Sequence, residues 1–163
     1  MVSPTNQNNR FDPKMMPPTN IAQKSEYFAL NIPARVGYLS LISECIRAGL
    51  EDHADLDGQN PILYNVQLAV QEICTNIITH AYRDDQEKEN RIWIEVGLDP
   101  GRITIQLEDS GDSFDLPDRA AVEIPSEPKD HGYGLFLIYS LVDDLIYQPG
   151  KNRNRWVIVK FLE

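Results

Sequence analysis

Three polar residues share one face of a predicted helix: Glu72, Asn76 and His80 follow one another at a spacing of four. Residues four apart lie above one another on a helix, so these side chains form a single stripe. A glutamate carboxylate can act as a general base, and an asparagine carbonyl oxygen can join waters and phosphates around Mg²⁺. Polar pairs at this spacing are also common on solvated helix faces, so the spacing alone favours a plain solvent-facing stripe.

A second polar segment, DSGDSFD at residues 109–115, comes directly after an alternating apolar stretch. Asp109 would end a strand there, where its carboxylate can accept a hydrogen bond from an amine. Gly111 would let the backbone pass close to a flat ligand, because glycine has no Cβ. Taken alone, the segment fits an ordinary acidic turn better than a binding site.

The third candidate is the glycine pair Gly132 and Gly134, which stands just before an apolar helical pattern. A helix N-terminus with small residues is suited to bind an anion such as phosphate. The pair lacks the spacing of the dinucleotide-binding and P-loop motifs. By itself it indicates no more than a flexible segment followed by a helix start.

These candidates need a scaffold, and the hydrophobic periodicity predicts one. The predicted order is strand, helix, helix, strand, strand, helix, strand, strand, over residues 27–32, 36–50, 61–82, 92–96, 103–107, 134–142, 145–148 and 156–161. The alternating stretches on either side of the turn Asp99-Pro100-Gly101 are typical of a hairpin. We therefore expect an α+β fold, a two-layer α/β sandwich with a mixed, mostly antiparallel sheet and its helices on one face.

Two stretches fall outside this pattern. Residues 1–23 are rich in proline and asparagine and poor in apolar residues, which predicts a flexible tail. Residues 110–131 mix Gly, Pro, Asp, Ser and Lys and are long for a loop inside a compact domain, which predicts a functional lid. The domain itself is expected over residues 24–163.

Two acidic residues, Asp143 and Asp144, follow the helix expected at 134–142. Negative charge opposes the dipole at a helix C-terminus, so helix stability does not explain them. We expect a contact with a loop or with a neighbouring basic group.

The composition disfavours several classes of function. The 163 residues carry 15 basic and 25 acidic side chains, a net charge of −10, which argues against binding to nucleic acid or to an anionic membrane surface. No apolar run reaches the roughly 18–20 residues that span a membrane, and the N-terminus shows no secretory signal. Cys45 and Cys74 suggest neither a disulfide framework nor a zinc site, which points to a reducing cytoplasm.

In their order along the chain, the three motifs carry a resemblance that none has alone. Residues 72–82, with the ending His80-Ala81-Tyr82, resemble the N box of the GHKL ATPase/kinase superfamily. Residues 109–115 resemble its G1 box, and residues 132–135 followed by Val142-Asp143 resemble its G2 box. The His-Ala-Tyr ending and the short Phe-Asp G1 box are similar to the RsbW-like anti-sigma-factor serine/threonine-protein kinases. The resemblance covers about residues 24–163.

The resemblance implies a Bergerat-type sandwich that binds ATP with Mg²⁺ between the helices and beneath the lid. By the family pattern, Glu72 would be the general base, Asn76 the magnesium ligand and Asp109 the acceptor for the adenine amino group. Gly111 would lie against the adenine ring, and Gly132 and Gly134 would give their N–H groups to the phosphates. The ATP-binding residues implied are Asn76, Asp109, Gly111, Phe114, Gly132, Tyr133, Gly134 and Leu135.

The resemblance also implies partners: a small anti-sigma-antagonist protein of the STAS type, phosphorylated on a serine, and often a sigma factor held inactive. Relatives suggest a homodimer. Two positions depart from the family pattern. Asp130 stands where some relatives carry an arginine before the first G2 glycine, and residues 151–156 read KNRNRW where relatives often have Gly-Thr.

Asp130 keeps an alternative open, a nucleotide-binding anti-sigma or scaffold module with little phosphotransfer. The catalytic domain of a two-component histidine kinase is a weaker alternative, because no helical region with a phospho-acceptor histidine precedes the domain. An acidic α+β domain without this chemistry would require a chance alignment of all three motifs.

Overall fold

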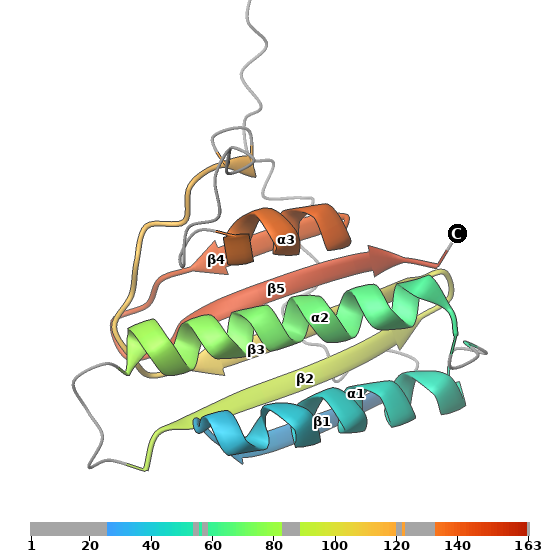
Figure 1. Ribbon diagram of the computed structural model, residues 1–163, viewed down its shortest axis with the longest axis horizontal. Coiled ribbons are helices and arrows are strands. Elements are labelled where there is room, and N and C mark those ends of the chain that lie inside the picture. The colour runs from blue at the N-terminus through green and yellow to red at the C-terminus, as the bar shows by residue number, and fades with distance from the viewer. Residues whose placement is uncertain are drawn as a thin grey trace, which may run out of the picture.

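The computed structural model describes residues 26–53, 56, 59–82, 89–119, 122 and 133–162. Across these residues the elements follow the predicted order, and the α+β two-layer arrangement is confirmed (Figure 1). The tail predicted at 1–23 and the part of the lid predicted beyond residue 119, apart from Val122, lie outside the described residues. Within the described ranges, no helix is long and apolar enough to cross a membrane.

Five strands form one sheet: β1 (Glu26–Pro33), β2 (Arg91–Asp99), β3 (Arg102–Asp109), β4 (Asp144–Gln148) and β5 (Asn154–Phe161). Their spatial order is β1-β2-β3-β5-β4, and all four pairings are antiparallel. The sheet is therefore antiparallel at every pairing instead of partly parallel. The predicted hairpin is β2–β3, and Gly101 takes a φ of 79° in its turn, a conformation that favours glycine.

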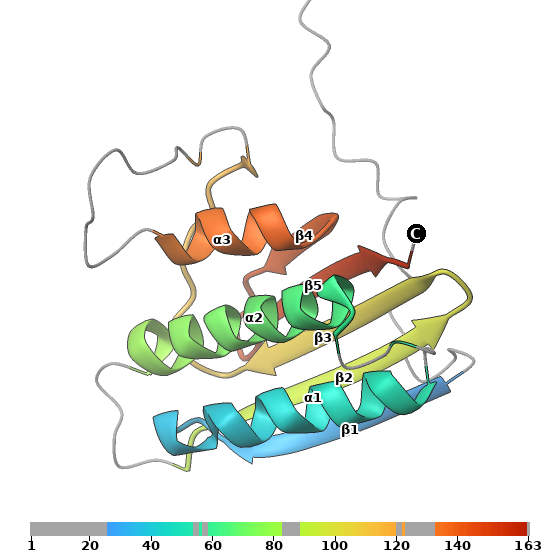
Figure 2. The same cartoon turned by 45° about the vertical axis from the view of Figure 1, so that its right-hand side comes forward.

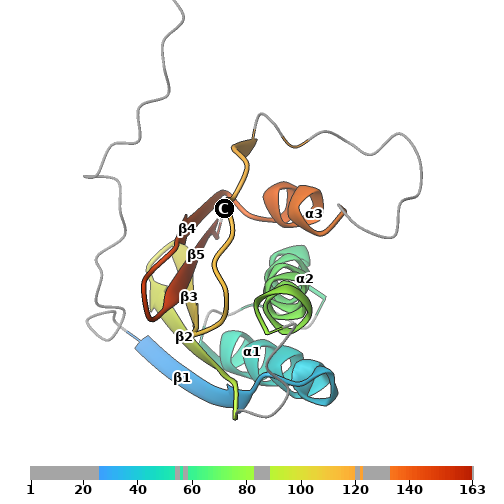
Figure 3. The ribbon, with the colours of Figure 1, turned by 90° about the vertical axis from the view of Figure 1, so that its left-hand side faces the viewer.

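Three α-helices cover one face of this sheet (Figure 3): α1 (Leu39–His53), α2 (Pro61–Asn76) and α3 (Tyr133–Leu141). Figure 2 shows them in a single layer, with α2 between α1 and α3 and in contact with both. A short 3-10 turn, η3 (Val36–Tyr38), precedes α1. Helix α2 begins at Pro61 because Asn60 caps it, its Oδ1 accepting from Ile62 N at 2.9 Å.

The core lies between the sheet and the helix layer. Val96, Ile105 and Ile158 stand in register across β2, β3 and β5 and are fully buried. Ile73 of α2 is also fully buried in this core. Each such side chain contributes about 1.5–3 kcal/mol of burial free energy. This packing holds α2 against the sheet and so sets the position of the polar residues near its C-terminal end.

The C-terminal end of α2 departs from the continuous helix predicted through Tyr82. Residues Ile77–Ala81 form a π-helical turn, η4, a feature that is frequent at functional sites. Tyr82 follows, and its hydroxyl donates to Arg91 O at 3.1 Å and accepts from Ser110 N at 2.9 Å. The segment after Asn76 is thereby tied to the start of β2 and to the residue that follows β3.

Helix α3 ends on contacts that explain the acidic residue Asp143. Lys160 Nζ lies 3.2 Å from Asp143 Oδ1, and Phe161 N donates to Asp143 Oδ2 at 2.7 Å. The predicted contact with a basic group is confirmed for this residue. At the end of α3, the carbonyl of Tyr139 accepts from Arg119, which also donates to Asp143 O just beyond the helix. A cation is favourable at that end of a helix.

Candidate functional site

A pocket of about 360 Å³ opens at one end of the sandwich, where η4, the end of β3 and the start of α3 meet β4 and β5. Its apolar lining comprises Ile77, Ala81, Phe114, Leu135, Tyr147 and Trp156. Its other lining residues are Asn76, His80, Asp109, Asp112, Ser113 and Gly134. The volume falls in the range of about 300–1,000 Å³ that is typical of ligand sites. The pocket therefore brings residues of all three sequence motifs together.

Asp109 is the last residue of β3 and is 1% exposed. Its Oδ1 accepts two hydrogen bonds, from Gly111 N at 2.9 Å and from Asn154 Nδ2 at 3.0 Å. Burial raises the pKa of Asp109 above its ordinary value, and these two hydrogen bonds oppose that rise. Because both donors bond to Oδ1, the carboxylate has a fixed orientation while it lines the pocket.

Gly111 packs against the end of η4. A Cβ added at this position would lie 2.4 Å from Ala81 O and 2.6 Å from Ala81 Cβ, closer than real side chains approach. The next residue, Asp112, donates its N–H to Ala81 O at 2.9 Å. Glycine is required here by the protein's own backbone, and Gly111 is not among the residues that line the pocket. The expected contact of Gly111 with an adenine ring stays a prediction.

The start of α3 lies against the polar stripe of α2. A Cβ added to Gly134 would lie 3.1 Å from Glu72 Oε2 and 3.7 Å from both Asn76 Oδ1 and Asn76 Nδ2. Glu72 and Asn76, each half-buried, therefore face the first turn of α3. The first N–H groups of a helix have no partner within it, so they can bind an anion. The Glu72 carboxylate, the Asn76 amide and the N–H groups at the start of α3 therefore lie close together beside the pocket.

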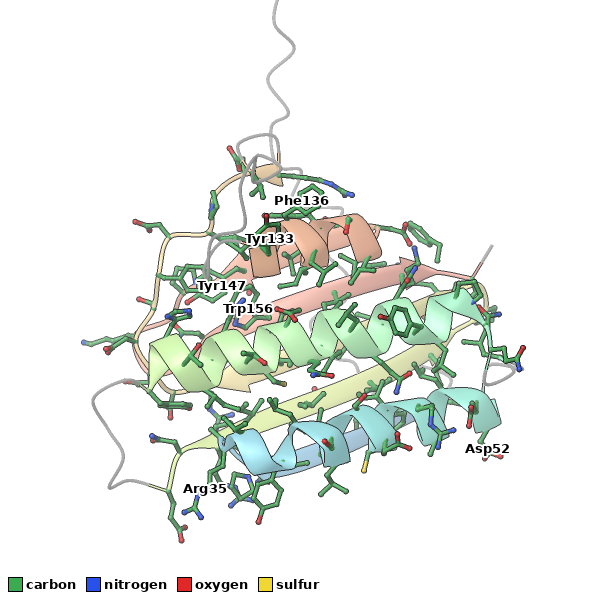
Figure 4. All side chains as sticks on the ribbon, viewed as in Figure 1. Arg35, Asp52, Tyr133, Phe136, Tyr147 and Trp156 are labelled. Carbon is green, nitrogen blue, oxygen red and sulfur yellow. The ribbon has the colours of Figure 1, made fainter. Side chains whose placement is uncertain are left out.

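Three aromatic side chains form one wall of the pocket. The ring of Phe114 stacks on Tyr147 with centroids 4.6 Å apart, and Trp156 lies 4.5 Å from Tyr147 and 5.2 Å from Phe114. Phe114 N also donates to Tyr147 Oη at 3.3 Å. Figure 4 labels Tyr147 and Trp156 of this wall, together with Tyr133 at the start of α3. Such a wall suits a flat, apolar ligand face.

Sequence reasoning missed Tyr147, Trp156 and Asn154 as site residues. Tyr147 pairs with Trp156 across β4 and β5, a partnership that neither strand reveals alone. Asn154 and Trp156 are both 1% exposed and two residues apart, so they share the core face of β5. An asparagine in phase with the buried residues of a strand was the one available signal.

The predicted site residues divide into three groups. Asn76, Asp109, Phe114, Gly134 and Leu135 line the pocket. Glu72 and Gly111 lie next to lining residues, and Tyr133, 40% exposed, begins α3. Gly132 and Asp130 lie outside the described residues.

Comparison with known proteins identifies the family. Residues 32–160 match the family described as "Histidine kinase-like ATPase domain". The chain is 32% identical over 130 residues to the serine-protein kinase RsbW of Bacillus cereus strain AH187, an overlap of 76% of this chain and 78% of the relative. The chain belongs to the RsbW family of histidine kinase-like ATPase domains. RsbW of Bacillus thuringiensis strain Al Hakam is similar to the same extent.

A solved structure supports the same fold. The crystal structure of the RsbU and RsbW domains of Rv1364c from Mycobacterium tuberculosis matches with a TM-score of 0.59 at 14% identity. The match covers 84% of this chain and 32% of that one, so the chain spans about a third of the length of the solved protein. The RsbW-like family and the GHKL-type fold predicted from the sequence are both confirmed.

Proposed function

We propose that this chain is an anti-sigma-factor-type serine kinase that uses ATP to phosphorylate a small anti-sigma-antagonist protein. Family membership supports kinase activity with ATP. One observation carries the assignment of roles: Glu72 and Asn76 of α2 and Gly134 of α3 meet beside a pocket that also contains the buried carboxylate of Asp109. In this arrangement Asp109 would accept a hydrogen bond from adenine at one end of the site. At the other end, Glu72 would accept a proton and the N–H groups at the start of α3 would bind phosphate.

The adenine end of the site is formed by Asp109 and the aromatic wall. An ionised carboxylate only accepts hydrogen bonds, so it suits the 6-amino group of adenine. Guanine presents an oxygen at the same ring position, which the carboxylate would repel. Phe114, Tyr147 and Trp156 would offer apolar surface to the base.

The phosphate end is formed by Asn76 and the start of α3. Within the described residues no group of three or more His, Cys, Asp or Glu could hold a metal ion. Magnesium readily keeps several waters and takes few protein ligands beside phosphate oxygens, so the Asn76 carbonyl oxygen fits it as a single protein ligand. When bound, Mg²⁺ supplies positive charge that neutralises the phosphates. The N–H groups of Tyr133, Gly134 and Gly132 would bind phosphate oxygens.

Glu72 would accept the proton of the substrate serine. As the serine oxygen forms its bond to the γ-phosphorus, the bond from that phosphorus to the β-phosphate oxygen breaks and ADP leaves. The serine proton passes to the Glu72 carboxylate. General base catalysis requires this carboxylate to lie within reach of the serine hydroxyl. The half-exposed position of Glu72 is compatible with an approaching protein substrate.

The regulatory logic we propose is partner switching between the antagonist, of the STAS type, and a sigma factor. Phosphorylation adds about 1.5–2 negative charges to the antagonist. This chain carries a net charge of −10, so the added charge weakens docking and frees the kinase for its other partner. A homodimer and a cytoplasmic location, both expected from the sequence, stay predictions.

The test has two stages. Thermal unfolding is measured with Mg²⁺·ATP, with Mg²⁺·GTP and without nucleotide; ATP at a hundred times its Kd should add about 2.7 kcal/mol of stability, and GTP little. Labelled ATP is then incubated with the chain and an STAS-type antagonist, and phosphoserine is measured. ATP binding without transfer would instead support the nucleotide-binding anti-sigma module that Asp130 keeps open. No stabilisation by millimolar ATP would contradict the nucleotide site.

A further inference from the structure

Asn154, the first residue of β5, joins two strands and a turn at the adenine end of the pocket. It is 1% exposed. Its Nδ2 donates to Asp109 Oδ1 at 3.0 Å and to Gly111 O at 2.9 Å, with a longer contact of 3.5 Å to Asp112 O. Its Oδ1 accepts from Gly150 N at 3.4 Å. A single amide therefore connects the β4–β5 loop, the end of β3 and the turn that follows β3.

The amide has the chemistry that this position requires. The NH₂ group carries two hydrogens, so it can donate to Asp109 and to Gly111 O at once. A hydroxyl has one hydrogen and could serve only one of these acceptors. A carboxylate at position 154 would place a second negative charge beside Asp109, and an apolar side chain would leave both acceptors without this donor.

The turn at 110–112 is held on its other side by η4 and Tyr82. Asp112 N donates to Ala81 O at 2.9 Å, and Ser110 N donates to the hydroxyl of Tyr82 at 2.9 Å. Loss of the Asn154 amide would therefore remove the side-chain link from β5 to the turn and to the Asp109 carboxylate. The pairing of β3 with β5 and the attachment of the turn to η4 and Tyr82 would remain. The expected result is a folded protein with a misdirected carboxylate.

We propose that Asn154 is a positioning residue that directs Asp109 toward the 6-amino group of a purine and so sets the preference for adenine. Asn154 and Gly111 both donate to Oδ1 of Asp109, so with respect to the described residues Oδ2 is left as the acceptor for the base. Without Asn154, the carboxylate would be held by Gly111 N alone. A less firmly held carboxylate would accept from the amino group less often and would also turn away from a 6-oxo group more easily. The preference for ATP over inosine triphosphate, which differs at this one position, therefore depends on Asn154. This inference rests on the proposed function, in which Asp109 contacts the base.

The experiment compares ATP and inosine triphosphate on the full chain and on three variants. Asn154→Thr retains one donor hydrogen, and Asn154→Leu retains none at a similar volume. Asn152→Leu, on the exposed part of the same loop, is the matched control. Kd values for both nucleotides are measured by calorimetry, and circular dichroism checks that each variant is folded.

We expect the wild type and Asn152→Leu to prefer ATP over inosine triphosphate to the same degree. Asn154→Leu should weaken ATP binding by about tenfold or more, the scale of one hydrogen bond to a charged group, and change inosine triphosphate binding less than threefold, roughly. Asn154→Thr should fall between them. With the antagonist assay available, KM for ATP should rise in the Asn154 variants while kcat at saturating ATP stays near wild type, because adenine binding contributes equally to ground and transition states.

Each of three outcomes would overturn a different claim. If wild type binds both nucleotides equally, the adenine contact in the proposed function fails. If wild type prefers ATP and folded Asn154 variants keep the same ratio, the positioning role fails while the proposed function stands. If a folded variant loses affinity for both nucleotides in equal measure, Asn154 is structural only. Asn154→Thr decides these points should the leucine variant not fold.

Discussion

Two carboxylates of the site have different surroundings that suit different tasks. Asp109 is almost fully buried and its Oδ1 is held by two N–H donors. Glu72 is half-buried and lies beside Gly134, so it is more accessible than Asp109. A carboxylate with a fixed orientation suits recognition, whereas an accessible one suits proton acceptance. The difference in environment supports the roles proposed for them.

The first prediction at this scale concerns proton acceptance. Glu72→Gln keeps the shape of the side chain and removes its basicity, so ATP affinity should stay within about twofold of wild type. Transfer to the antagonist should fall by about 10²–10⁴-fold, the usual contribution of a general base. Calorimetry and single-turnover transfer measure the two effects. Equal turnover in both proteins would remove Glu72 from this role.

The second prediction concerns recognition of the base. Asp109→Asn keeps an acceptor oxygen for Asn154 and removes the negative charge. We expect ATP affinity to fall by about tenfold or more, since hydrogen bonds to charged groups contribute about 1.5–3 kcal/mol. Far-UV circular dichroism should be unchanged. Unaltered ATP affinity in calorimetry would mean that Asp109 does not contact the nucleotide.

At the scale of elements, the turn after β3 connects the sheet to the helix layer. Gly111 passes the end of η4 with no room for a side chain, and Tyr82 binds both the start of β2 and the start of this turn. Asp109 and η4 are therefore parts of one hydrogen-bonded unit. A nucleotide that contacts Asp109 at one end and Asn76 at the other should therefore bind less tightly when this unit is disrupted.

A substitution at Gly111 tests that connection. Gly111→Ala would place a Cβ 2.4 Å from Ala81 O, so the turn must move away from η4. We expect a loss of about 1–3 kcal/mol of unfolding free energy, the scale of overpacking, and weaker ATP binding. Gly37→Ala is the control, because a Cβ there meets nothing within 4 Å. Chemical denaturation compares the two, and equal stability would show that the close contact with Ala81 is not needed.

At the scale of the whole molecule, an anionic ligand must bind to an anionic protein. The chain carries a net charge of −10, and ATP is itself strongly negative. The overall field opposes association, so in the proposed function the donors at the start of α3 and a bound cation would have to outweigh it. Binding of ATP should therefore depend strongly on divalent metal.

Metal removal tests this dependence. An excess of EDTA over Mg²⁺ should weaken ATP binding, measured by calorimetry, while the melting temperature of the nucleotide-free protein stays unchanged. The second expectation follows because no cluster of three or more His, Cys, Asp or Glu in the described residues could hold a structural metal. In Asn76→Ala, ATP binding should respond less to EDTA. ATP affinity that is indifferent to EDTA in wild type would argue against Asn76 as a metal ligand.

The order of the elements, the helix face with Glu72 and Asn76, and the strand end at Asp109 can all be predicted from the amino-acid sequence. These features follow from local periodicity, capping and turn residues, which act over a few neighbouring positions. Asn60 and Pro61 at the start of α2 are one example, and the β2–β3 hairpin is another.

The surroundings of those residues depend on contacts between elements that are distant in the sequence. Asn154 reaches Asp109 across 45 positions of sequence, and Tyr147 meets Trp156 through the pairing of β4 and β5. The contact of Gly111 with Ala81 depends on how α2 packs on the sheet. Strand register and helix docking are set by burial of the whole core, which no local pattern contains. The motifs were therefore visible in the sequence, and the side chains that orient them were not.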